Sequence, residues 1–427
     1  MKSFKIYTLG CKVNTYESEA ISEILLNAGY SLSNEENADI IIVNTCAVTS
    51  VAGQKSRKQI HKVRRENPNS LIIALGCFVQ LEKDKLFLEG ADILLGTNNR
   101  KEIVELIENY YIEKENKIIL SNPRENNVYE CLSICTYSEN TRAFVKIQDG
   151  CDNFCSYCII PYTRGKFRSR SKKDILDEIH NLVNNGFKEI VLTGIDTASY
   201  GKDINENFVS LLGEILASEP NLLRLRISSI EASQIDERFI ELLHKEKRIA
   251  MHLHIPLQSG SEEVLKRMNR KYTKAEFYSR IEKIKEEHKD IALACDIIEG
   301  FPGETEEEFE ETIEFVKKCG FVFLHVFPYS IRVGTPAAKM KNQIDSKTKK
   351  ERVKKLINIG LELEKEYKEK FVDKELEVLF ETNEGDVWKG YSSNYLEVKV
   401  ASKVNLKNKM VLVKYKSEGL SEIINIK

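Results

Sequence analysis

The sequence predicts an α/β protein in three parts: a doubly wound parallel sheet, a partial (β/α)6 barrel and a small all-β barrel. The first two parts are indicated by runs of Ile, Val and Leu that alternate with helical periodicity and lack strict polar alternation. The third is indicated by short alternating runs after residue 371. We therefore expect domains over residues 1–115, 141–370 and 371–427, with a linker over 116–140.

Four apolar runs separated by helical segments predict the first part. The expected strands are FKIYTLG (4–10), DIIIVNT (39–45), SLIIALG (70–76) and ADILLG (91–96). Helices are expected over 17–28 and 55–65 and from residue 100, and Gly29 follows the first as a stop signal. Such alternation is typical of parallel strands joined by crossover helices. The polar stretch KENKIILSNPRENNVYE (114–130) predicts the linker.

Six further apolar runs predict the partial barrel, because each is followed by a helical segment. These runs cover 142–148, 189–194, 223–229, 251–257, 291–300 and 321–330. The helical segments cover 174–185, 208–217, 235–243, 274–288 and 306–319, and a long charged helix is expected over 346–370. The all-β part is expected from runs at 376–381, 387–391, 395–400, 410–415 and 421–426.

Composition limits the class of protein. Of 427 residues, 42% are hydrophobic and 30% charged, as in globular proteins, and the net charge is -2. A nucleic-acid partner would therefore be held by local basic patches. No apolar run has membrane-helix length and the N-terminus lacks a signal-peptide pattern, so we expect a cytoplasmic protein with no membrane partner. Ten cysteines in a reducing compartment indicate metal ligation or redox chemistry.

The motif CDNFCSYC places Cys151, Cys155 and Cys158 on one short loop after an expected strand. Three thiolates and one vacancy favour an iron-sulfur cube with one open iron. A zinc site is an alternative, although closed zinc sites use four protein ligands and the loop supplies three. Simple burial of the three cysteines is the other alternative.

Three further cysteines follow expected parallel strands. Cys11, Cys46 and Cys77 each come directly after a run, and Gly10 and Gly76 precede two of them. Because the carboxyl ends of parallel strands share one edge of a sheet, we expect the three thiols to converge. They predict a second iron-sulfur cluster, with core cysteines at strand ends as the alternative.

These motifs resemble a known family. CDNFCSYC is similar to the signature of radical S-adenosylmethionine (SAM) enzymes, and TLGCKVNTYESEA, VNTCAVT and ALGCFVQ resemble the N-terminal domain of the methylthiotransferases. The resemblance covers essentially the whole chain. It implies an N-terminal cluster domain, a radical SAM core and a C-terminal domain similar to the RNA-binding TRAM domain.

Within the family, GCKVNTYE, LTGIDT, RISSIEASQI and LHIPLQSGS most resemble the branch that acts on tRNA carrying N6-threonylcarbamoyladenosine at position 37. That branch forms the 2-methylthio derivative. Sister branches act on isopentenyladenosine in tRNA or on a ribosomal protein, and both remain alternatives. A non-catalytic RNA-binding iron-sulfur protein is an alternative from another class.

The resemblance implies two [4Fe-4S] clusters and SAM as cofactors. Cys151, Cys155 and Cys158 would hold the cluster that binds and cleaves SAM. The other triad, Cys11, Cys46 and Cys77, would hold the auxiliary cluster that carries the inserted sulfur. The radical would remove hydrogen from adenine C2 in the tRNA anticodon loop. Such a reaction implies an electron donor such as flavodoxin or ferredoxin, and a sulfur donor.

Five residues match positions near SAM in the family. They are Tyr157, Thr193, Gly194, Glu231 and Gln258. The match at Thr193 and Gly194 is loose, since TGI stands where the family usually has Gly-Gly-Glu. Tyr157 could simply pack in the interior, and Glu231 and Gln258 could cap helices.

Basic and aromatic residues suggest where RNA would bind. The run after the CDNFCSYC loop comprises Arg164, Lys166, Arg168 and Arg170, and substrate phosphate would pass there. The C-terminal part carries residues suited to base stacking and backbone neutralisation: Trp388, Tyr391, Tyr395, Lys389, Lys399 and Lys414. An ordinary barrel core with a charged surface is the alternative there.

Overall fold

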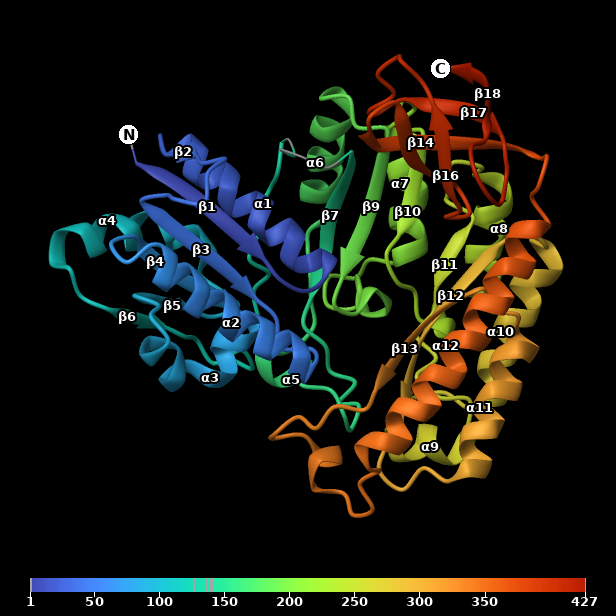
Figure 1. The fold of residues 1–427 in the computed structure, drawn as a ribbon, viewed down its shortest axis with the longest axis horizontal. Helices are drawn as coiled ribbons and strands as arrows, with labels where there is room; N and C mark the ends of the chain where they lie inside the picture. Colours follow the sequence, from blue (N-terminus) through green and yellow to red (C-terminus); the bar gives the residue numbers. More distant parts are fainter. Residues whose placement is uncertain (1, 126, 136, 138–140, 427) are drawn as a thin grey trace.

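The computed structural model describes residues 2–125, 127–135, 137 and 141–426. Their strands form four sheets, of six, four, three and five strands along the chain (Figure 1). The six-stranded sheet is parallel and the five-stranded sheet is antiparallel, which confirms the predicted α/β class. None of the helices in this described part is both long and apolar enough to cross a membrane.

The N-terminal sheet is covered by helices on both faces. Its elements are β1 (Ser3–Thr8), α1 (Lys12–Asn27), β2 (Ser31–Leu32), β3 (Ile40–Thr45), α2 (Ser50–Glu66), β4 (Leu71–Gly76), α3 (Cys77–Leu88), β5 (Ile93–Leu95), the 3-10 helix η1 (Arg100–Glu102), α4 (Ile103–Glu113) and β6 (Lys117–Ile119). The strand order is β2-β1-β3-β4-β5-β6. Ile41 and Ile72 belong to the core under α2 and α3, whereas Ile40 and Ile73 belong to the core under α1 and α4. Burial on both faces explains the unbroken apolar runs.

The segment predicted to be a linker is largely built into the fold. Its first residues form β6, in which Ile118 pairs with Leu94 of β5. Further along, Leu132 and Ile134 are buried in the core of the middle part. The hydroxyl of Tyr16 on α1 donates a hydrogen bond to the Leu132 carbonyl at 2.5 Å. This segment therefore fastens the first part of the molecule to the second.

The middle part is a partial barrel, as predicted, whose six parallel strands form two three-stranded sets connected by an isolated bridge between Leu225 and Ile249. Its strands are β7 (Arg142–Asp149), β9 (Glu189–Gly194), β10 (Arg224–Ile227), β11 (His252–His254), β12 (Ala292–Glu299) and β13 (Phe323–Pro328), with the short β8 (Arg168–Ser169) antiparallel to β7. Its helices are α5 (Ile160–Thr163), α6 (Lys172–Asn184), α7 (Phe208–Ser218), α8 (Glu237–Lys245), α9 (Glu262–Arg267), α10 (Lys274–Glu287) and α11 (Glu306–Cys319). Three 3-10 helices complete it: η2 (Thr197–Ser199), η3 (Ala232–Gln234) and η4 (Pro336–Lys339).

The barrel is open on one side. Within the described residues, no ladder joins β13 to β7, the first and last strands of the parallel set. Helix α1 of the N-terminal part packs against β7, so the N-terminal sheet lies beside this part of the barrel (Figure 1). The carboxyl ends of strands from two different sheets can therefore face a shared space.

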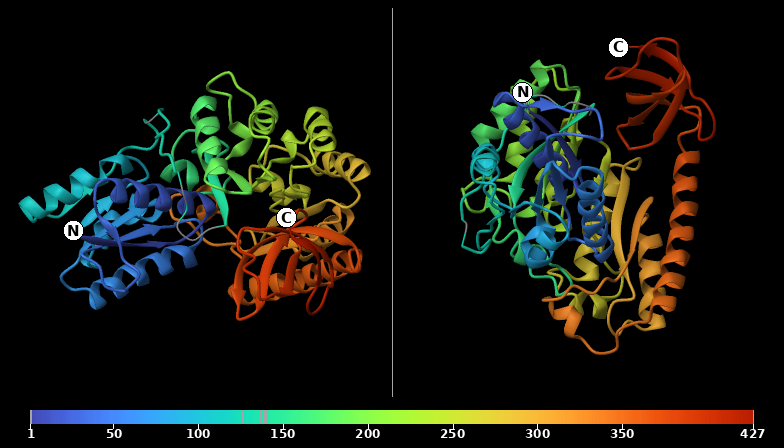
Figure 2. Two further views of the ribbon diagram at one scale, coloured as in Figure 1. Left: turned by 90° about the horizontal axis from the view of Figure 1, so that it is seen from above. Right: turned by 60° about the vertical axis from the view of Figure 1, so that its left-hand side comes forward.

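The C-terminal part is an antiparallel sheet at the end of a long helix. Helix α12 (Ser346–Glu369) packs on β13 and leads to it (Figure 2). The strands are β14 (Glu375–Glu384), β15 (Val387–Ser392), β16 (Glu397–Ala401), β17 (Met410–Lys414) and β18 (Glu422–Ile426), in the order β16-β15-β14-β17-β18. The Ser421 main-chain N–H donates to the Lys399 carbonyl at 2.8 Å. This contact joins the two edges at one end and gives a half-barrel.

Candidate active site

Three thiols from one loop line a single cavity. Cys151, Cys155 and Cys158 follow β7, and all three border a cavity of about 190 Å³. The loop is fixed to the barrel because the Ser156 N–H donates to the Met268 carbonyl at 2.9 Å. The compact C-x3-C-x2-C spacing thus places three sulfur atoms around one space.

The surroundings of these thiols fit an iron-sulfur cluster. Burial raises the pKa of Cys158 to about 12. Burial also raises the pKa of Cys151, and the neighbouring carboxylate of Asp196 raises it further. Such thiols ionise only beside a strong positive charge, which bound iron supplies. The donor set is therefore suited to a [4Fe-4S] cluster.

Three of the side chains expected near SAM line the same cavity. They are Tyr157, Glu231 and Gln258. Arg270 joins them, donating from Nη2 to Glu231 at 2.9 Å and from Nη1 towards the Cys155 sulfur at 3.6 Å. Arg270 was not among the residues predicted from sequence, because nothing in LKRMNRKY separates it from the other cations on the surface.

The other two expected residues lie just behind the cavity. Thr193 is buried in β9, and Gly194 ends that strand. A Cβ at Gly194 would stand 3.2 Å from Oε1 of Gln148, so a side chain there would need a shift. The next two residues, Ile195 and Asp196, line the cavity. The end of β9 thus forms part of its wall.

Cys11, Cys46 and Cys77 meet at the edge of the N-terminal sheet. Cys11 precedes α1, Cys46 follows β3, and Cys77 begins α3. Gly10 has φ 110°, and a Cβ on it would lie 2.6 Å from Cβ and 2.8 Å from Sγ of Cys46. The chain around Cys11 therefore approaches Cys46 as closely as glycine allows.

The pKa shifts of the three thiols also indicate that they lie close together. Burial raises the pKa of Cys46 to about 11, and the thiols of Cys77 and Cys11 raise it further. Cys11 keeps access to solvent but is densely surrounded by protein, which raises its pKa as well. Nε of Arg164 donates to the Cys77 sulfur at 3.2 Å. A positive group that binds all three sulfurs would stabilise their thiolate forms.

The separation of the sulfur atoms within each triad bears on which metal centre fits. Among the described residues, no three His, Cys, Asp or Glu side chains are arranged to hold a single metal ion. A cube of iron and sulfide is wider than one ion, so its ligands stand further apart. The soft thiol donors suit such a cluster at the second triad, where Gly10 lets the chain pass close to Cys46.

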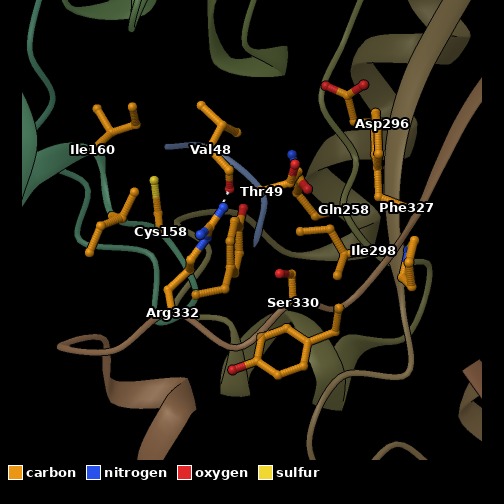
Figure 3. Close-up of a pocket in the computed structure, with 14 residues that line it drawn as sticks. Val48, Thr49, Cys158, Ile160, Gln258, Asp296, Ile298, Phe327, Ser330 and Arg332 are labelled. Carbon is orange, nitrogen blue, oxygen red and sulfur yellow. Dashed lines mark hydrogen bonds between the residues drawn. The ribbon is translucent and has the colours of Figure 1, made fainter. Parts of the chain in front are cut away.

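A second cavity lies beside Cys158 (Figure 3). It has a volume of about 270 Å³ and is bordered by Cys158 on one side and by Val48 and Thr49, next to Cys46, on the other. The Cys77 thiol is close enough to contribute to the raised pKa of Cys158. Cys158 of the first triad therefore lines this cavity directly, and the second triad is connected to it through Val48 and Thr49, which follow Cys46 along the chain.

Sequence reasoning missed two charged residues of this central cavity. Asp296 lies within β12 and pairs with Nε2 of His254 at 2.9 Å. Arg332 follows β13 and lines the opposite wall. An acid inside the apolar run IALACDIIEG and a cation just past the carboxyl end of a strand were the signals that could have found them.

The expected RNA-binding role of the run after the loop needs correction. The side chains of Arg164, Arg168 and Arg170 are buried, and only Lys166 of this run is exposed. Arg164 pairs with Glu17 at 2.8 Å. Arg168 forms an ion pair with Asp149 at 3.7 Å, and Arg170 forms one with Glu178. Guanidinium groups held in this way stiffen the interior and do not reach a phosphate.

A larger groove lies between the barrel and the C-terminal sheet. It measures about 610 Å³, and Lys12, Lys399, Tyr391 and Tyr395 are among its lining residues. Tyr395 stacks on Tyr391 at 5.1 Å and on His252 at 4.7 Å between ring centroids. Burial lowers the pKa of Lys12 to about 8, and nearby arginines lower it further.

Not every predicted stacking residue faces this groove. Trp388 is only 7% exposed and belongs to the core of the C-terminal sheet, so its ring cannot stack on an RNA base. Lys389 pairs with Glu397 at 2.6 Å, and Lys414 pairs with Asp373 at 3.6 Å. Lys399 is also close to Glu397, at 3.8 Å, but it lines the groove, as Tyr391 and Tyr395 do, so these three residues are the candidates for contact with a nucleic acid.

Comparison with known proteins gives the same picture. Residues 145–316 match the radical SAM superfamily, and residues 3–96 match a family described as uncharacterized, UPF0004. The structure resembles the radical SAM methyltransferase TsrM of Kitasatospora setae, with a TM-score of 0.60 and 14% identity. That likeness spans 79% of this chain and 76% of the other, and it concerns the fold alone.

Relatives in sequence span nearly the whole chain. Threonylcarbamoyladenosine tRNA methylthiotransferase MtaB of Bacillus subtilis is 44% identical over 98% of this chain and 95% of the relative. MtaB of Thermotoga maritima is 38% identical over 93% and 90%. The tRNA-2-methylthio-N(6)-dimethylallyladenosine synthase of Carboxydothermus hydrogenoformans is 39% identical over 85% and 84%. The chain therefore belongs to the methylthiotransferase family of radical SAM enzymes, which use SAM and [4Fe-4S] clusters.

Proposed function

We propose that this enzyme converts N6-threonylcarbamoyladenosine at position 37 of tRNA into its 2-methylthio derivative. The observation that carries the proposal is a cavity of about 270 Å³ that is lined by Cys158 and by Val48 and Thr49 after Cys46, with the Cys77 thiol close enough to raise the pKa of Cys158. The choice of nucleoside is supported by the 44% identity to the MtaB enzyme of Bacillus subtilis. The assignment of the six thiols as cluster ligands is part of this proposal.

When bound, SAM and the two clusters supply the radical that activates adenine C2 and the methylthio group that is added there. The chain holds the reactants in place. Its apolar side chains Ile160, Ile298 and Phe327 make part of the wall of the central cavity non-polar. Cys158 and Val48 both line this cavity. Holding the base at a set distance from both centres removes the cost of bringing three reactants together.

We infer that the anticodon loop enters along the groove beside the C-terminal sheet. Stacked Tyr391 and Tyr395 offer a surface for a base, and Lys399 and Lys12 offer positive charge for phosphates. Lys12 is adjacent to Cys11, so this groove leads to the auxiliary triad. The enzyme would act in the cytoplasm on tRNA, with electrons from flavodoxin or ferredoxin and sulfur from a separate donor.

The test is anaerobic turnover with anticodon stem-loops. The reconstituted enzyme is given SAM, dithionite, sulfide and RNA that carries threonylcarbamoyladenosine, dimethylallyladenosine or unmodified adenosine. Mass spectrometry should show a methylthio nucleoside from the first RNA only. Reaction with the dimethylallyl RNA instead would favour the activity for which the 39% identical relative is named. Modification of none of the three RNAs would favour a protein substrate or a binding role.

A further inference from the structure

The central cavity contains a cation with an unused donor. Of the charged side chains among its described lining residues, Asp296 is negative and Arg332 is the single positive group. Nε of Arg332 donates to the Val48 carbonyl at 3.3 Å. Nη2 of Arg332 is buried and has no hydrogen-bond partner among the described residues. A buried guanidinium N–H without a partner is costly, so the site is complete only when an acceptor enters the cavity.

The position of this guanidinium is fixed by its own segment. The Thr335 hydroxyl donates to the Arg332 carbonyl at 2.7 Å. The Ser50 N–H donates to the Ser330 hydroxyl at 3.1 Å, which ties the segment to the chain after Cys46. The guanidinium therefore stands between the barrel and the N-terminal sheet, beside Val48 (Figure 3). Because a guanidinium is always charged, the preferred acceptor is an anion.

Three anions could approach: the SAM carboxylate, an RNA phosphate or a carboxylate on the target base. The SAM side has its own cation, Arg270, in the cavity that holds Cys151, Cys155 and Cys158. Phosphates have the lysine-lined groove of about 610 Å³. Arg332 instead faces a mostly apolar cavity of about 270 Å³, which takes one small group and not an RNA strand.

We propose that Arg332 binds the carboxylate of the threonylcarbamoyl group and thereby selects this nucleoside over one with an uncharged N6 substituent. This inference rests on the proposed function. A dimethylallyl group in the same place would leave the buried Nη2 donor of Arg332 without a partner. A site built to pair with a charged group rejects the analogue that lacks the charge, because its own donor then stays unsatisfied.

The test compares stem-loops whose modified base carries the free threonyl carboxylate or its methyl ester. Wild-type enzyme should bind the free acid about ten- to a hundredfold more tightly than the ester. Arg332→Met should bind both RNAs alike, at the affinity that wild type has for the ester. Arg332→Lys should restore part of the preference. Arg238→Met, at a side chain that is 67% exposed on α8, is the matched control and should behave as wild type.

Cluster content and SAM cleavage are measured in parallel. Arg332→Met should retain the iron of both clusters and form 5'-deoxyadenosine, so that a loss of binding is not a loss of the active site. The inference is overturned if Arg332→Met still prefers the free acid, if it weakens all RNAs equally, or if it weakens SAM alone. If wild type methylthiolates only the dimethylallyl RNA, the proposed function itself fails. If wild type acts on the threonylcarbamoyl RNA and the variant keeps its preference, only the inference fails.

Discussion

Arg164 links the chemistry of the auxiliary triad to the interior of the fold. One guanidinium contacts the Cys77 sulfur at 3.2 Å, Glu17 at 2.8 Å and Asp149 at 3.1 Å. Burial by itself would raise the pKa of Glu17, but Arg100, Arg164 and Lys146 outweigh it and hold the pKa well below its usual range. The Glu17 carboxylate is therefore charged although it is buried, and the three neighbouring cations are needed to stabilise that charge.

The substitution Arg164→Met should destabilise the protein strongly. It keeps the aliphatic part of the side chain but removes the guanidinium group, which leaves Glu17 and Asp149 with fewer compensating charges in a buried position. Loss of one partner of a buried ion pair costs about 3–5 kcal/mol, and we expect a decrease of that order in the free energy of unfolding. Urea denaturation of the cluster-free protein measures it. Arg65→Met, at a side chain that is 77% exposed, should change stability by less than about 0.5 kcal/mol.

Single cysteine variants should separate the two clusters. Cys151→Ala should lower the iron content from about eight to about four per chain and abolish SAM cleavage. Cys11→Ala should lower iron equally but retain 5'-deoxyadenosine formation while sulfur insertion is lost. Cys135→Ala, at an exposed thiol, is the control and should keep all the iron. Sulfur insertion by Cys11→Ala would contradict the second-cluster assignment.

At the level of residues, sequence reasoning predicted that the thiols of each triad lie close together, but it did not predict that the arginines are buried. Spacing on one loop and position after parallel strands are properties of the chain itself, so both triads could be predicted from the sequence. Burial is not such a property. Arg164 and Arg170 belong to a run that predicts a basic surface, yet their partners Glu17 and Glu178 come from other elements. For Arg332, the position just past the carboxyl end of an expected strand was the one feature of the sequence that could have indicated a role in the site.

The turn between β1 and α1 determines whether the auxiliary triad can form. Gly10 adopts φ 110°, which other residues rarely adopt, and the space of a Cβ is taken by Cys46 at 2.6 Å. Helix α1 then starts directly after Cys11, so its first turn carries Asn14, which donates to the Thr45 carbonyl at 3.1 Å. The strand end, the turn and the helix start are therefore one unit.

Gly10→Ala should disrupt the auxiliary cluster without touching a ligand. The added methyl group would push the chain at Cys11 away from Cys46, and iron should decrease to about half, as in Cys11→Ala. Gly29→Ala is the matched control, because Gly29 also has a positive φ of 88° but nothing lies within 4 Å of its Cβ position. That variant should lose about 1 kcal/mol of stability and keep its iron. Full iron in Gly10→Ala would show that the turn can relax.

Most elements could be predicted because their hydrophobic period is clear. The exceptions have physical causes. Helix α1 was expected to begin at residue 17, since KVNTY contains β-branched residues that are weak helix formers, but it begins at Lys12. Strand β6 was missed because its three residues lie in a polar stretch and gain their place only by pairing with β5. Short edge strands depend on a neighbour more than on their own composition.

The arrangement of the three parts depends on buried polar contacts between distant segments. Arg226 on β10 donates to the carbonyls of Ser392 and Ser393 at 3.1 and 3.2 Å. Arg224 donates to the Glu377 carbonyl at 3.0 Å. Glu189 on β9 forms an ion pair with each guanidinium group, at 3.0 Å with Arg224 and at 2.6 Å with Arg226. One carboxylate thus positions the two arginines that attach the C-terminal sheet to the barrel.

These contacts could not be predicted from the sequence, which identifies the barrel and the C-terminal sheet but not how they pack against each other. Arg224 and Arg226 lie in the run LRLRISS, where alternation suggests one solvent-facing side of a strand. In the structure, that side is covered by the C-terminal sheet, and both side chains are buried. The main-chain carbonyls they bind carry no signal in the sequence at all.

Glu189→Gln should therefore loosen the C-terminal sheet. Burial alone would raise the pKa of Glu189, but Arg226 and Arg224 lower it to about 2. Because the folded pKa is below the unfolded value of 4.5, this carboxylate stabilises docking fully above about pH 4.5 and loses its effect as the pH falls towards 2. At pH 7 the variant leaves two buried guanidinium groups without their carboxylate, at a cost of about 3 kcal/mol.

Limited proteolysis of the full chain near residue 371 measures this loosening. Wild type should resist cleavage at pH 7 and become sensitive only on acidification below about pH 4.5. Glu189→Gln should be cleaved faster at pH 7 and show little further change with acid. Glu384→Gln, at an exposed position in the same sheet, should match wild type. Equal resistance of Glu189→Gln and wild type would mean that apolar packing alone attaches the sheet. Because the groove between barrel and sheet contains Lys12 and Tyr395, a loosened sheet should also weaken binding of the anticodon stem-loop.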